Sequence, residues 1–320
     1  MSTKHDEPPA AKYYHYLCLL TLVVFVSCDT TPPKTIVRHT TGTSKTDTAV
    51  ATVPVAGKKK AKKKIYLTFD DGPNKGTDNV LNIVKEENVP VTFFLVGAHA
   101  FGSKAQQVTW DSLQASKLVE LCNHSFTHAW YNSYNKFYSL PDSVVSDFHK
   151  TTAQLQLKNG IGRTPGRNIW RVDSIQFTDN AKTKAAADSL YNAGYDMLGW
   201  DLEWHFDPKT MRAIKSGDDL ANQIDSLLLK NKTKQPGNLV LLAHDQVYKN
   251  TEDSLQLHQL IRRLKANSEY EFAVASNYPG VKKKSVTDSM LKRNMSKSDS
   301  LRKNNIINKD TNRVVKPAIG

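Results

Sequence analysis

Short apolar runs alternate with longer amphipathic stretches along most of this 320-residue chain, and this alternation limits the folds that it can adopt. The apolar runs predict strands near residues 65–69, 91–96, 118–122, 195–200, 239–243 and 270–275. The amphipathic stretches predict helices near residues 77–88, 142–158, 180–193, 217–230 and 252–266. Strands that alternate with helices are typical of parallel βαβ units. We therefore expect one large α/β domain, and the pattern alone leaves open whether its sheet closes into a barrel.

Two adjacent carboxylates, Asp70 and Asp71, follow the first predicted strand. Because Gly72 and Pro73 end the strand, both aspartates fall at a strand-to-loop junction and their side chains point in different directions. One carboxylate can therefore bind a metal while its neighbour has another role. An isolated Asp-Asp-Gly is more often a simple turn, so this interpretation needs support from elsewhere in the chain.

Two histidines four residues apart, His124 and His128, provide that support. Their spacing brings both imidazoles to one side of a helical turn or tight loop, and imidazole nitrogens bind zinc at about 2.0–2.1 Å. A His-x-x-x-His pair also occurs by chance, but together with one aspartate it makes three protein ligands. Three ligands leave one coordination position open, which is typical of catalytic zinc sites.

Two further segments follow in order: Arg163-Thr164-Pro165-Gly166, and Leu242-Ala243-His244 at the end of an apolar run. With the aspartates and the histidine pair, they resemble the motifs of the polysaccharide deacetylases of carbohydrate esterase family 4, the proteins with a NodB homology domain. Residues 91–97 also resemble the second strand of that family, and the similarity covers roughly residues 65–280. The resemblance implies a distorted (β/α) barrel with about seven strands.

The resemblance also implies roles for the residues around the metal. Asp70 matches the catalytic base, Asp71, His124 and His128 match the metal ligands, and Arg163 matches the arginine that pairs with the base. Zinc is the expected cofactor from the ligand types, although such a site also accepts cobalt, nickel or manganese.

Four more matched positions belong to the part of the site around the general acid. His244 matches the general acid, and Glu203 stands where the family usually has the aspartate that orients this histidine. Because Glu203 is one methylene longer than aspartate, Asp201 is an alternative. Trp204 matches a pocket wall, with a packed core tryptophan as the alternative, and Leu242 matches the lining of the acetyl pocket.

The third motif departs from the family pattern. An aromatic residue often precedes its glycine, whereas here Gly166 follows Pro165 directly and Arg167 comes next. Arg167 therefore competes with Arg163 for the role of pairing with the base.

The residue types predict metal-assisted hydrolysis, and the resemblance implies that the group removed is an acetyl group. A divalent metal lowers the pKa of bound water towards about 7, so that a carboxylate can deprotonate it near neutral pH. A histidine can then protonate the leaving amine. We expect a deacetylase that acts on N-acetylated sugars of a polysaccharide. Peptidoglycan is the first candidate for its substrate. The alternatives are an O-deacetylase of acetylxylan-like polymers and a glycan-binding or scaffold protein without turnover.

The flanks differ in composition from the centre. Residues 1–28 have the form of a secretory signal peptide, too short in its apolar part to span a bilayer, and Cys28 falls at a loose lipoprotein processing site. Residues 29–64 are rich in Thr, Pro and Lys and predict a tether, and residues 281–320 predict a basic tail without a core. We therefore expect export to a bacterial cell envelope and a lipid anchor in the membrane.

The net charge of +13 belongs to the flanks. Residues 29–64 carry nine Lys or Arg against two Asp or Glu, and residues 281–320 carry eleven against three, which leaves residues 65–280 nearly neutral. The basic composition therefore says nothing about the site, and an exported chain is not expected to bind nucleic acid. Cys122 is the only cysteine after Cys28, so no disulfide framework is expected. The sequence leaves the oligomeric state open.

Overall fold

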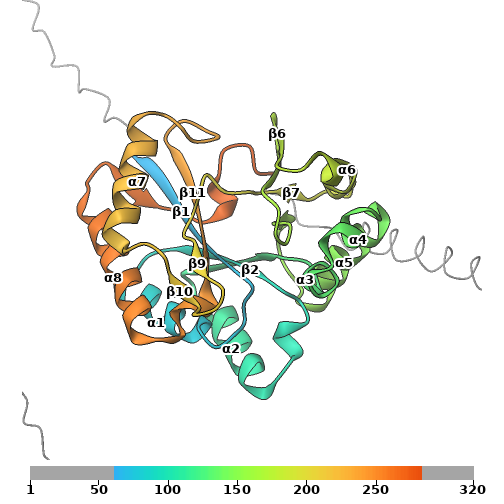
Figure 1. Ribbon diagram of the computed structural model, residues 1–320, viewed down its shortest axis with the longest axis horizontal. Coiled ribbons are helices and arrows are strands. Elements are labelled where there is room, and N and C mark those ends of the chain that lie inside the picture. The colour runs from blue at the N-terminus through green and yellow to red at the C-terminus, as the bar shows by residue number, and fades with distance from the viewer. Residues whose placement is uncertain (1–60, 283–320) are drawn as a thin grey trace, which may run out of the picture. The chain divides into compact units, whose positions relative to one another are not determined.

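A curved and mostly parallel sheet forms the centre of the part that the computed structural model describes, residues 61–282 (Figure 1). Seven parallel strands follow one another across it in the order β7-β4-β3-β2-β1-β11-β8. In that order they span Asp196–Met197, Ile161–Gly162, Val119–Asn123, Val91–Leu95, Lys63–Asp70, Asn238–His244 and Leu202–Glu203. The predicted distorted (β/α) barrel with about seven strands is confirmed.

The barrel is distorted because its first and last parallel strands, β7 and β8, are not paired with each other and leave an opening between them. The chain itself crosses the opening, since residues 198–201 connect β7 to β8. Leu198 N donates a hydrogen bond to Gly162 O on one side, and Asp201 N donates to Val240 O on the other. The backbone of the connection thus completes the barrel wall.

Other strands extend the sheet or stand apart from it. The antiparallel hairpin of β5 (Ile169–Val172) and β6 (Ile175–Thr178) continues the sheet beyond β7, and β12 (Tyr270–Phe272) pairs with the first residues of β1. A separate hairpin is made by β9 (Phe206–Asp207) and β10 (Arg212–Ala213). This β9–β10 hairpin lies directly after β8 in the chain.

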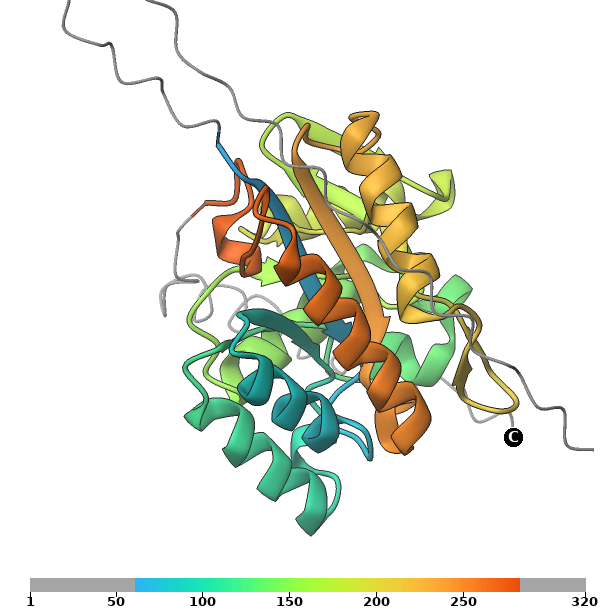
Figure 2. The same cartoon turned by 90° about the vertical axis from the view of Figure 1, so that its left-hand side faces the viewer.

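Helices cover the outside of the barrel. The longer ones are α1 (Thr77–Glu87), α2 (Lys104–Ala115), α5 (Pro141–Gln154), α6 (Lys184–Asn192), α7 (Gly217–Leu229) and α8 (Thr251–Ala266). The short ones are α4 (Tyr134–Tyr138) and α3 (His128–Asn132), which is a single left-handed turn. Figure 2 shows α7 and α8 lying beside β11. No helix among residues 61–282 has the length and apolar character needed to cross a membrane.

Alternate residues of the strands face two different cores. Leu67, Phe69 and Leu241 pack against α1, α7 and α8 in the larger outer core. Tyr66, Phe94 and Val240 pack inside the barrel, where the segment after β12 brings Ala275 and Tyr278. Residues 68, 70, 242 and 244 are in register with this inner set, so they line the barrel interior nearer its carboxyl end.

Most of the predicted strands and helices agree with the structure, but the prediction lacked the short helices α3 and α4, the two-residue strands β4 and β8, and the β9–β10 hairpin. Three further differences have a clear physical reason or a longer extent. Helix α2 was missed, because its sequence is largely polar and buries only Thr109, Trp110 and Leu113. The β5–β6 hairpin was also missed. The strand predicted over 195–200 is paired only at Asp196–Met197, since the chain leaves the sheet there to cross the barrel opening.

The predicted domain boundaries need small corrections. Lys63 and Lys64, assigned to the tether, belong to β1, where Lys63 N donates to Glu269 O and Lys64 N to Gly237 O. Lys282, assigned to the tail, donates its backbone N–H to Asp196 Oδ2 at 2.6 Å. The predicted signal peptide with Cys28, the tether up to residue 60 and the tail from residue 283 lie outside the described residues.

Candidate metal centre and active site

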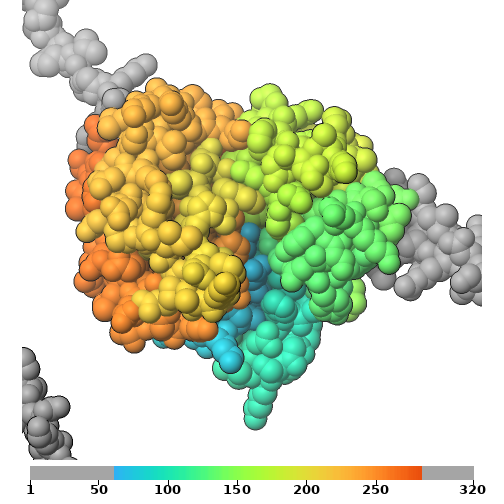
Figure 3. Space-filling view, in the orientation of Figure 1, coloured from blue at the N-terminus to red at the C-terminus, as the bar shows by residue number. Residues whose placement is uncertain are grey.

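The predicted site residues collect at the carboxyl ends of neighbouring strands. Asp70 ends β1, His124 follows β3, Arg163 follows β4, and His244 ends β11. The space-filling view shows a hollow at this end, with the blue segment around the end of β1 recessed between yellow, green and teal segments (Figure 3). Carboxyl ends of parallel strands are where α/β barrels place their chemistry.

Asp71, His124 and His128 form a cluster of ligand atoms. The Oδ1 atom of Asp71 lies 3.1 Å from His128 Nε2 and 3.4 Å from His124 Nε2. All three ligand atoms lie within 4.8 Å of one another. These are the three residues that the sequence predicted as metal ligands.

Hydrogen bonds at Nδ1, the ring nitrogen away from Asp71, fix the orientation of each imidazole. His124 Nδ1 donates to Arg163 O at 2.9 Å, and His128 Nδ1 donates to Asn132 Oδ1 at 2.5 Å. The hydroxyl of Tyr134 donates to the same Asn132 oxygen at 2.9 Å. Because Nδ1 of each ring is bonded to an oxygen acceptor, Nε2 is the nitrogen that faces Asp71 and would be the one to bind a metal.

The cluster fits a divalent cation. Asp71 Oδ1 is buried without a hydrogen-bond partner, which is costly unless a cation occupies the position. Burial disfavours its charge, but the two histidines beside it more than compensate and hold the pKa of Asp71 well below its ordinary value. Asp71 at φ 76° and His128 at φ 50° also have left-handed backbones, which are strained for residues other than glycine.

A buried carboxylate that the sequence did not identify supports the loop between the two histidines. Asp147 of α5 accepts the backbone N–H groups of Phe126 and Thr127 at 2.9 and 3.0 Å, and also the hydroxyl of Thr127 at 3.1 Å. Its position in a helix 19 residues after His128 gives no local signal of this contact. Asp147 therefore supports, from a remote element, the loop that carries His124 and His128.

Asp70 is paired with Arg163, as predicted. The Arg163 guanidinium donates to Asp70 Oδ1 at 2.8 Å, and both side chains are almost completely buried. The same guanidinium donates to Thr68 Oγ1 at 2.7 Å and to the carbonyls of Leu198 and Gly199, each at 3.0 Å. It thereby joins Asp70 to the backbone that crosses the barrel opening.

The competing assignment to Arg167 is wrong. Its guanidinium lies 3.9 Å from Asp179 Oδ2, and its side chain is 28% exposed. Asp70 Oδ2 faces the other way, towards His124 Nε2 at 3.7 Å. Asp70 therefore stands between the arginine and the metal cluster.

His244 lies beside Asp70, because the two residues are register partners in the paired strands β1 and β11. The predicted contact of Glu203 with His244 is not formed, since the Glu203 carboxylate lies 3.3 Å from His205 Nδ1. The alternative, Asp201, accepts the backbone N–H groups of Lys234 and Val240 instead. In the described structure, His244 Nδ1 is buried without a hydrogen-bond partner.

The two predicted pocket residues differ in outcome. Leu242 is 2% exposed and in register with Thr68, so it faces the barrel interior below the site. Trp204 packs in the outer core against Tyr248 and donates its indole N–H to Lys215 O at 2.9 Å. The core alternative for Trp204 is therefore the correct one, because β8 turns its side chain towards α7 and α8.

Another aromatic residue, which the sequence interpretation missed, contacts the predicted acid. The Phe206 ring lies 5.1 Å from the His244 ring between centroids, at an interplanar angle of 64°. Its position two residues after Trp204 in a Trp-His-Phe segment was the available signal.

Asp245, next to His244 in the chain, is fully buried and connects the end of β11 to the segment that follows β1. It accepts the Thr77 hydroxyl at 2.5 Å and a hydrogen bond from the Asn74 amide, both in the segment after Asp71. Gly72 and Gly76 have no room for a Cβ, which would come within 2.5 Å of Asp245 Oδ2 and 1.9 Å of Asp245 O. The loop after β1 is thus fitted closely against the end of β11.

The barrel thus places a two-histidine, one-aspartate cluster beside an arginine-paired aspartate and a histidine. The family model for polysaccharide deacetylase matches residues 57–167. Over that segment the chain is similar to the polysaccharide deacetylases, the family whose motifs its sequence resembles.

Individual proteins agree with this similarity. A peptidoglycan-N-acetylglucosamine deacetylase of Bacillus cereus is 26% identical over 61% of this chain and 64% of its own length. A bifunctional xylanase/xylan deacetylase of Cellvibrio japonicus is 26% identical over 60% of this chain and 24% of its own length. The chain thus spans less than two thirds of both relatives. The solved structure of a Streptococcus mutans CE4 esterase shares the fold, with a TM-score of 0.50 and 24% identity over 67% of this chain and 86% of that one.

Proposed function

We propose that this protein is a metal-dependent hydrolase that removes N-acetyl groups from amino sugars of a polysaccharide. The observation that carries the proposal is the placement of the cluster of Asp71, His124 and His128 beside an arginine-paired Asp70, with His244 on the neighbouring strand. Base, ligands and acid are thereby collected at one end of the barrel. A divalent cation bound there supplies a Lewis acid and makes a water molecule more acidic.

The chain's own residues perform the proton transfers. Asp70 Oδ1 is held by Arg163, whereas Oδ2 faces the cluster and is the atom that accepts a proton from the attacking water. His244, the register partner of Asp70 on β11, donates a proton to the leaving nitrogen as the general acid. Leu242 lies below on the same strand face and provides an apolar wall for the acetyl methyl group.

Peptidoglycan is the substrate that we propose first. The name of the Bacillus cereus relative, a peptidoglycan-N-acetylglucosamine deacetylase that aligns with 61% of the chain, supports it. The Cellvibrio japonicus relative, named as a xylan deacetylase, supports O-deacetylation of xylan as the second candidate. Zinc is the proposed metal, because two imidazoles and one carboxylate are ligands that it commonly takes.

We also propose that the protein is exported and anchored to the bacterial cell envelope through lipid on Cys28. The signal-like sequence of residues 1–28 is the support for this proposal. Growth with a radiolabelled fatty acid tests it, because label should enter the wild-type protein and not Cys28→Ala.

Acetate release by the purified protein tests the proposed activity. We expect release from peptidoglycan or N-acetylglucosamine oligomers, loss of release after chelation, and recovery with Zn²⁺. Release from acetylxylan alone would select the O-deacetylase. A protein that binds Zn²⁺ and retains a glycan but releases no acetate would be a binding or scaffold protein instead. His244→Gln is the matched variant, since it should bind metal and lose turnover.

A further inference from the structure

His244 is placed without the carboxylate that was expected to orient it. Its Nδ1 atom is buried and has no hydrogen-bond partner among residues 61–282. The Glu203 carboxylate lies beside His205 instead, and the Asp201 carboxylate accepts hydrogen bonds from two backbone N–H groups. A proton donor must nevertheless stay within about 2.6–3.2 Å of its acceptor, so something else has to restrain the ring.

The contact that the structure provides is aromatic. The rings of Phe206 and His244 meet edge to face, with centroids 5.1 Å apart and an angle of 64°. This geometry is the preferred one for aromatic pairs, because the positive edge of one ring meets the negative face of the other. Phe206 therefore limits rotation of the imidazole without forming a hydrogen bond to it.

Phe206 is mounted on the β9–β10 hairpin, which is internally well connected. Asp207 Oδ1 accepts the backbone N–H groups of Lys209 and Thr210 across the turn, at 2.7 and 3.2 Å. Ile214 N donates to His205 O at 3.0 Å where the hairpin ends. Phe206 is the register partner of Ala213 on the opposite strand.

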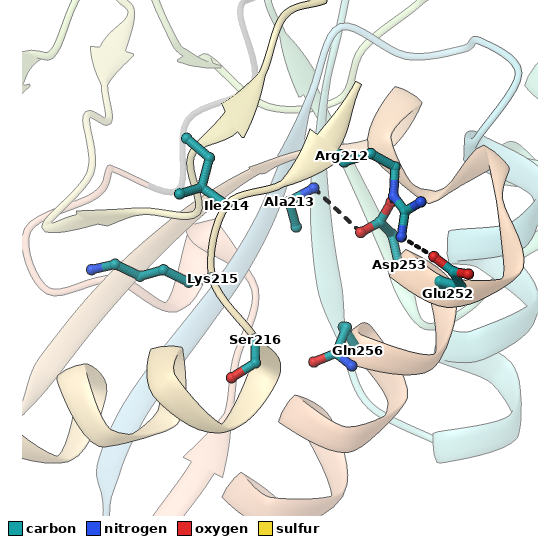
Figure 4. A pocket seen from close by; sticks show the side chains of 8 residues that line it. All are labelled: Arg212, Ala213, Ile214, Lys215, Ser216, Glu252, Asp253 and Gln256. Atoms are coloured by element: carbon teal, nitrogen blue, oxygen red, sulfur yellow. Dashed lines mark hydrogen bonds and ion pairs between the residues drawn. The ribbon is translucent and has the colours of Figure 1, made fainter. Parts of the chain in front are cut away.

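The hairpin is anchored to the first turn of α8. Arg212 Nε lies 2.7 Å from Asp253 Oδ2, and Ala213 N donates to Asp253 Oδ1 at 3.3 Å. Figure 4 shows Arg212 reaching towards both Glu252 and Asp253, at the edge of a polar depression between the hairpin and α8. Because Asp253 is buried and Ala213 is opposite Phe206, this anchor fixes the strand that carries Phe206.

We propose that Phe206 is the positioning residue of His244, and that the Arg212–Asp253 pair holds it in place. The inference rests on the proposed function, in which His244 is the acid. It replaces the expected carboxylate with an aromatic contact from a hairpin that is distant from the metal ligands in the chain.

The kinetic test uses Phe206→Leu, which keeps an apolar side chain and removes the ring. We expect kcat to fall about 10- to 100-fold, with KM and bound metal unchanged, because a misplaced group costs rate in this range. Phe206→Tyr should restore most of the rate. Phe272→Leu is the control, since Phe272 is also partly buried against the outer core but belongs to β12, at the other end of β1. Equal loss of kcat in the two leucine variants, or none in Phe206→Leu, would overturn the inference.

A second measurement does not depend on turnover. The ring current of Phe206 should shift the His244 ring protons in the NMR spectrum, with the resonances assigned by His244→Gln. We expect the shift to be lost in Phe206→Leu and reduced in Arg212→Gln. An unchanged His244 spectrum in Phe206→Leu would contradict the inference even if the wild-type protein releases no acetate, whereas that lack of release counts only against the proposed function.

Discussion

Replacement of Arg163 by methionine should be among the most damaging changes in the protein. The side chain is completely buried and donates to four acceptors, Asp70 Oδ1, Thr68 Oγ1 and the carbonyls of Leu198 and Gly199. Methionine fills similar volume but provides no donor. Asp70 would then be a buried charge without its partner, and two backbone carbonyls would lose their hydrogen bonds.

The magnitude follows from these losses. Removing one partner of a buried ion pair costs about 3–5 kcal/mol. Each buried acceptor left unsatisfied costs about 1–3 kcal/mol, so the two carbonyls bring the total to about 5–11 kcal/mol. That is comparable with the whole stability of a typical domain, about 5–15 kcal/mol. We therefore expect Arg163→Met to lower Tm by at least about 10–20 °C, at about 2–4 °C per kcal/mol.

Urea and thermal unfolding followed by circular dichroism measure the effect, with two companion variants. Arg167→Met is the matched control, because its 28% exposed side chain makes only a 3.9 Å ion pair and should cost about 1 kcal/mol or less. Arg163→Lys keeps the positive charge but lacks the planar guanidinium, and it replaces the methionine variant in the measurement if that variant does not fold.

The same measurements can refute the reasoning. Asp70→Asn should cost less in the Arg163→Met background than in the wild type, because the stranded charge is then neutralised. A loss below about 1 kcal/mol for Arg163→Met, or strictly additive effects of the two substitutions, would show that the pair does not hold the site together.

Three further predictions concern the surroundings of the metal cluster. Asp147→Ala should weaken Zn²⁺ affinity about 10- to 100-fold in a metal titration, whereas Asp147→Asn, which keeps one acceptor oxygen, should do less harm. Asp70→Asn should keep the metal and lose acetate release, but His124→Ala should lose both; equal metal loss by elemental analysis would contradict the separate roles of the two neighbouring aspartates. Burial raises the pKa of Asp245 to about 7, although Thr77 and Asn74 hydrogen-bond to its carboxylate. The folded state therefore binds a proton that the unfolded state releases, and the free energy of unfolding should fall as pH rises from about 4 to about 7. Urea midpoints across this range should depend less on pH in Asp245→Asn.

The sequence predicted the parts of the fold that depend on local pattern. Strand β11 is visible in the sequence as an uninterrupted apolar run. Helices α7 and α8 follow the capping residues Ser216 and Asn250, so the sequence shows where each helix begins. Helix α2 is mostly polar and contacts the barrel through few residues. The two-residue strands β4, β7 and β8 are defined by pairing with distant strands, which no local pattern records.

The candidate metal cluster was predictable for a similar reason. Asp71 and the two histidines lie in short segments whose spacing limits their geometry, and the structure brings them together. The groups that support them come from elsewhere: Asp147 lies on α5 and Phe206 on the β9–β10 hairpin. Spacing could not show that Glu203 would contact His205 in place of His244.

The backbone at the metal cluster adds a cost that composition cannot reveal. His128 begins a turn in which every residue through Asn132 has a positive φ, although none is glycine. Such conformations cost about 1–2 kcal/mol per residue, so other contacts must impose them. The Thr127 hydroxyl accepts the N–H of Trp130 at 2.9 Å, and Asp147 holds Thr127 in turn. The strained turn places His128 Nε2 opposite Asp71 Oδ1, an atom that is itself buried without a hydrogen bond. The strained backbone begins at His128 and the unsatisfied oxygen belongs to Asp71, so both costs lie at the same cluster, and a bound cation would relieve the second of them. The position of the strain therefore supports metal binding independently of the motif.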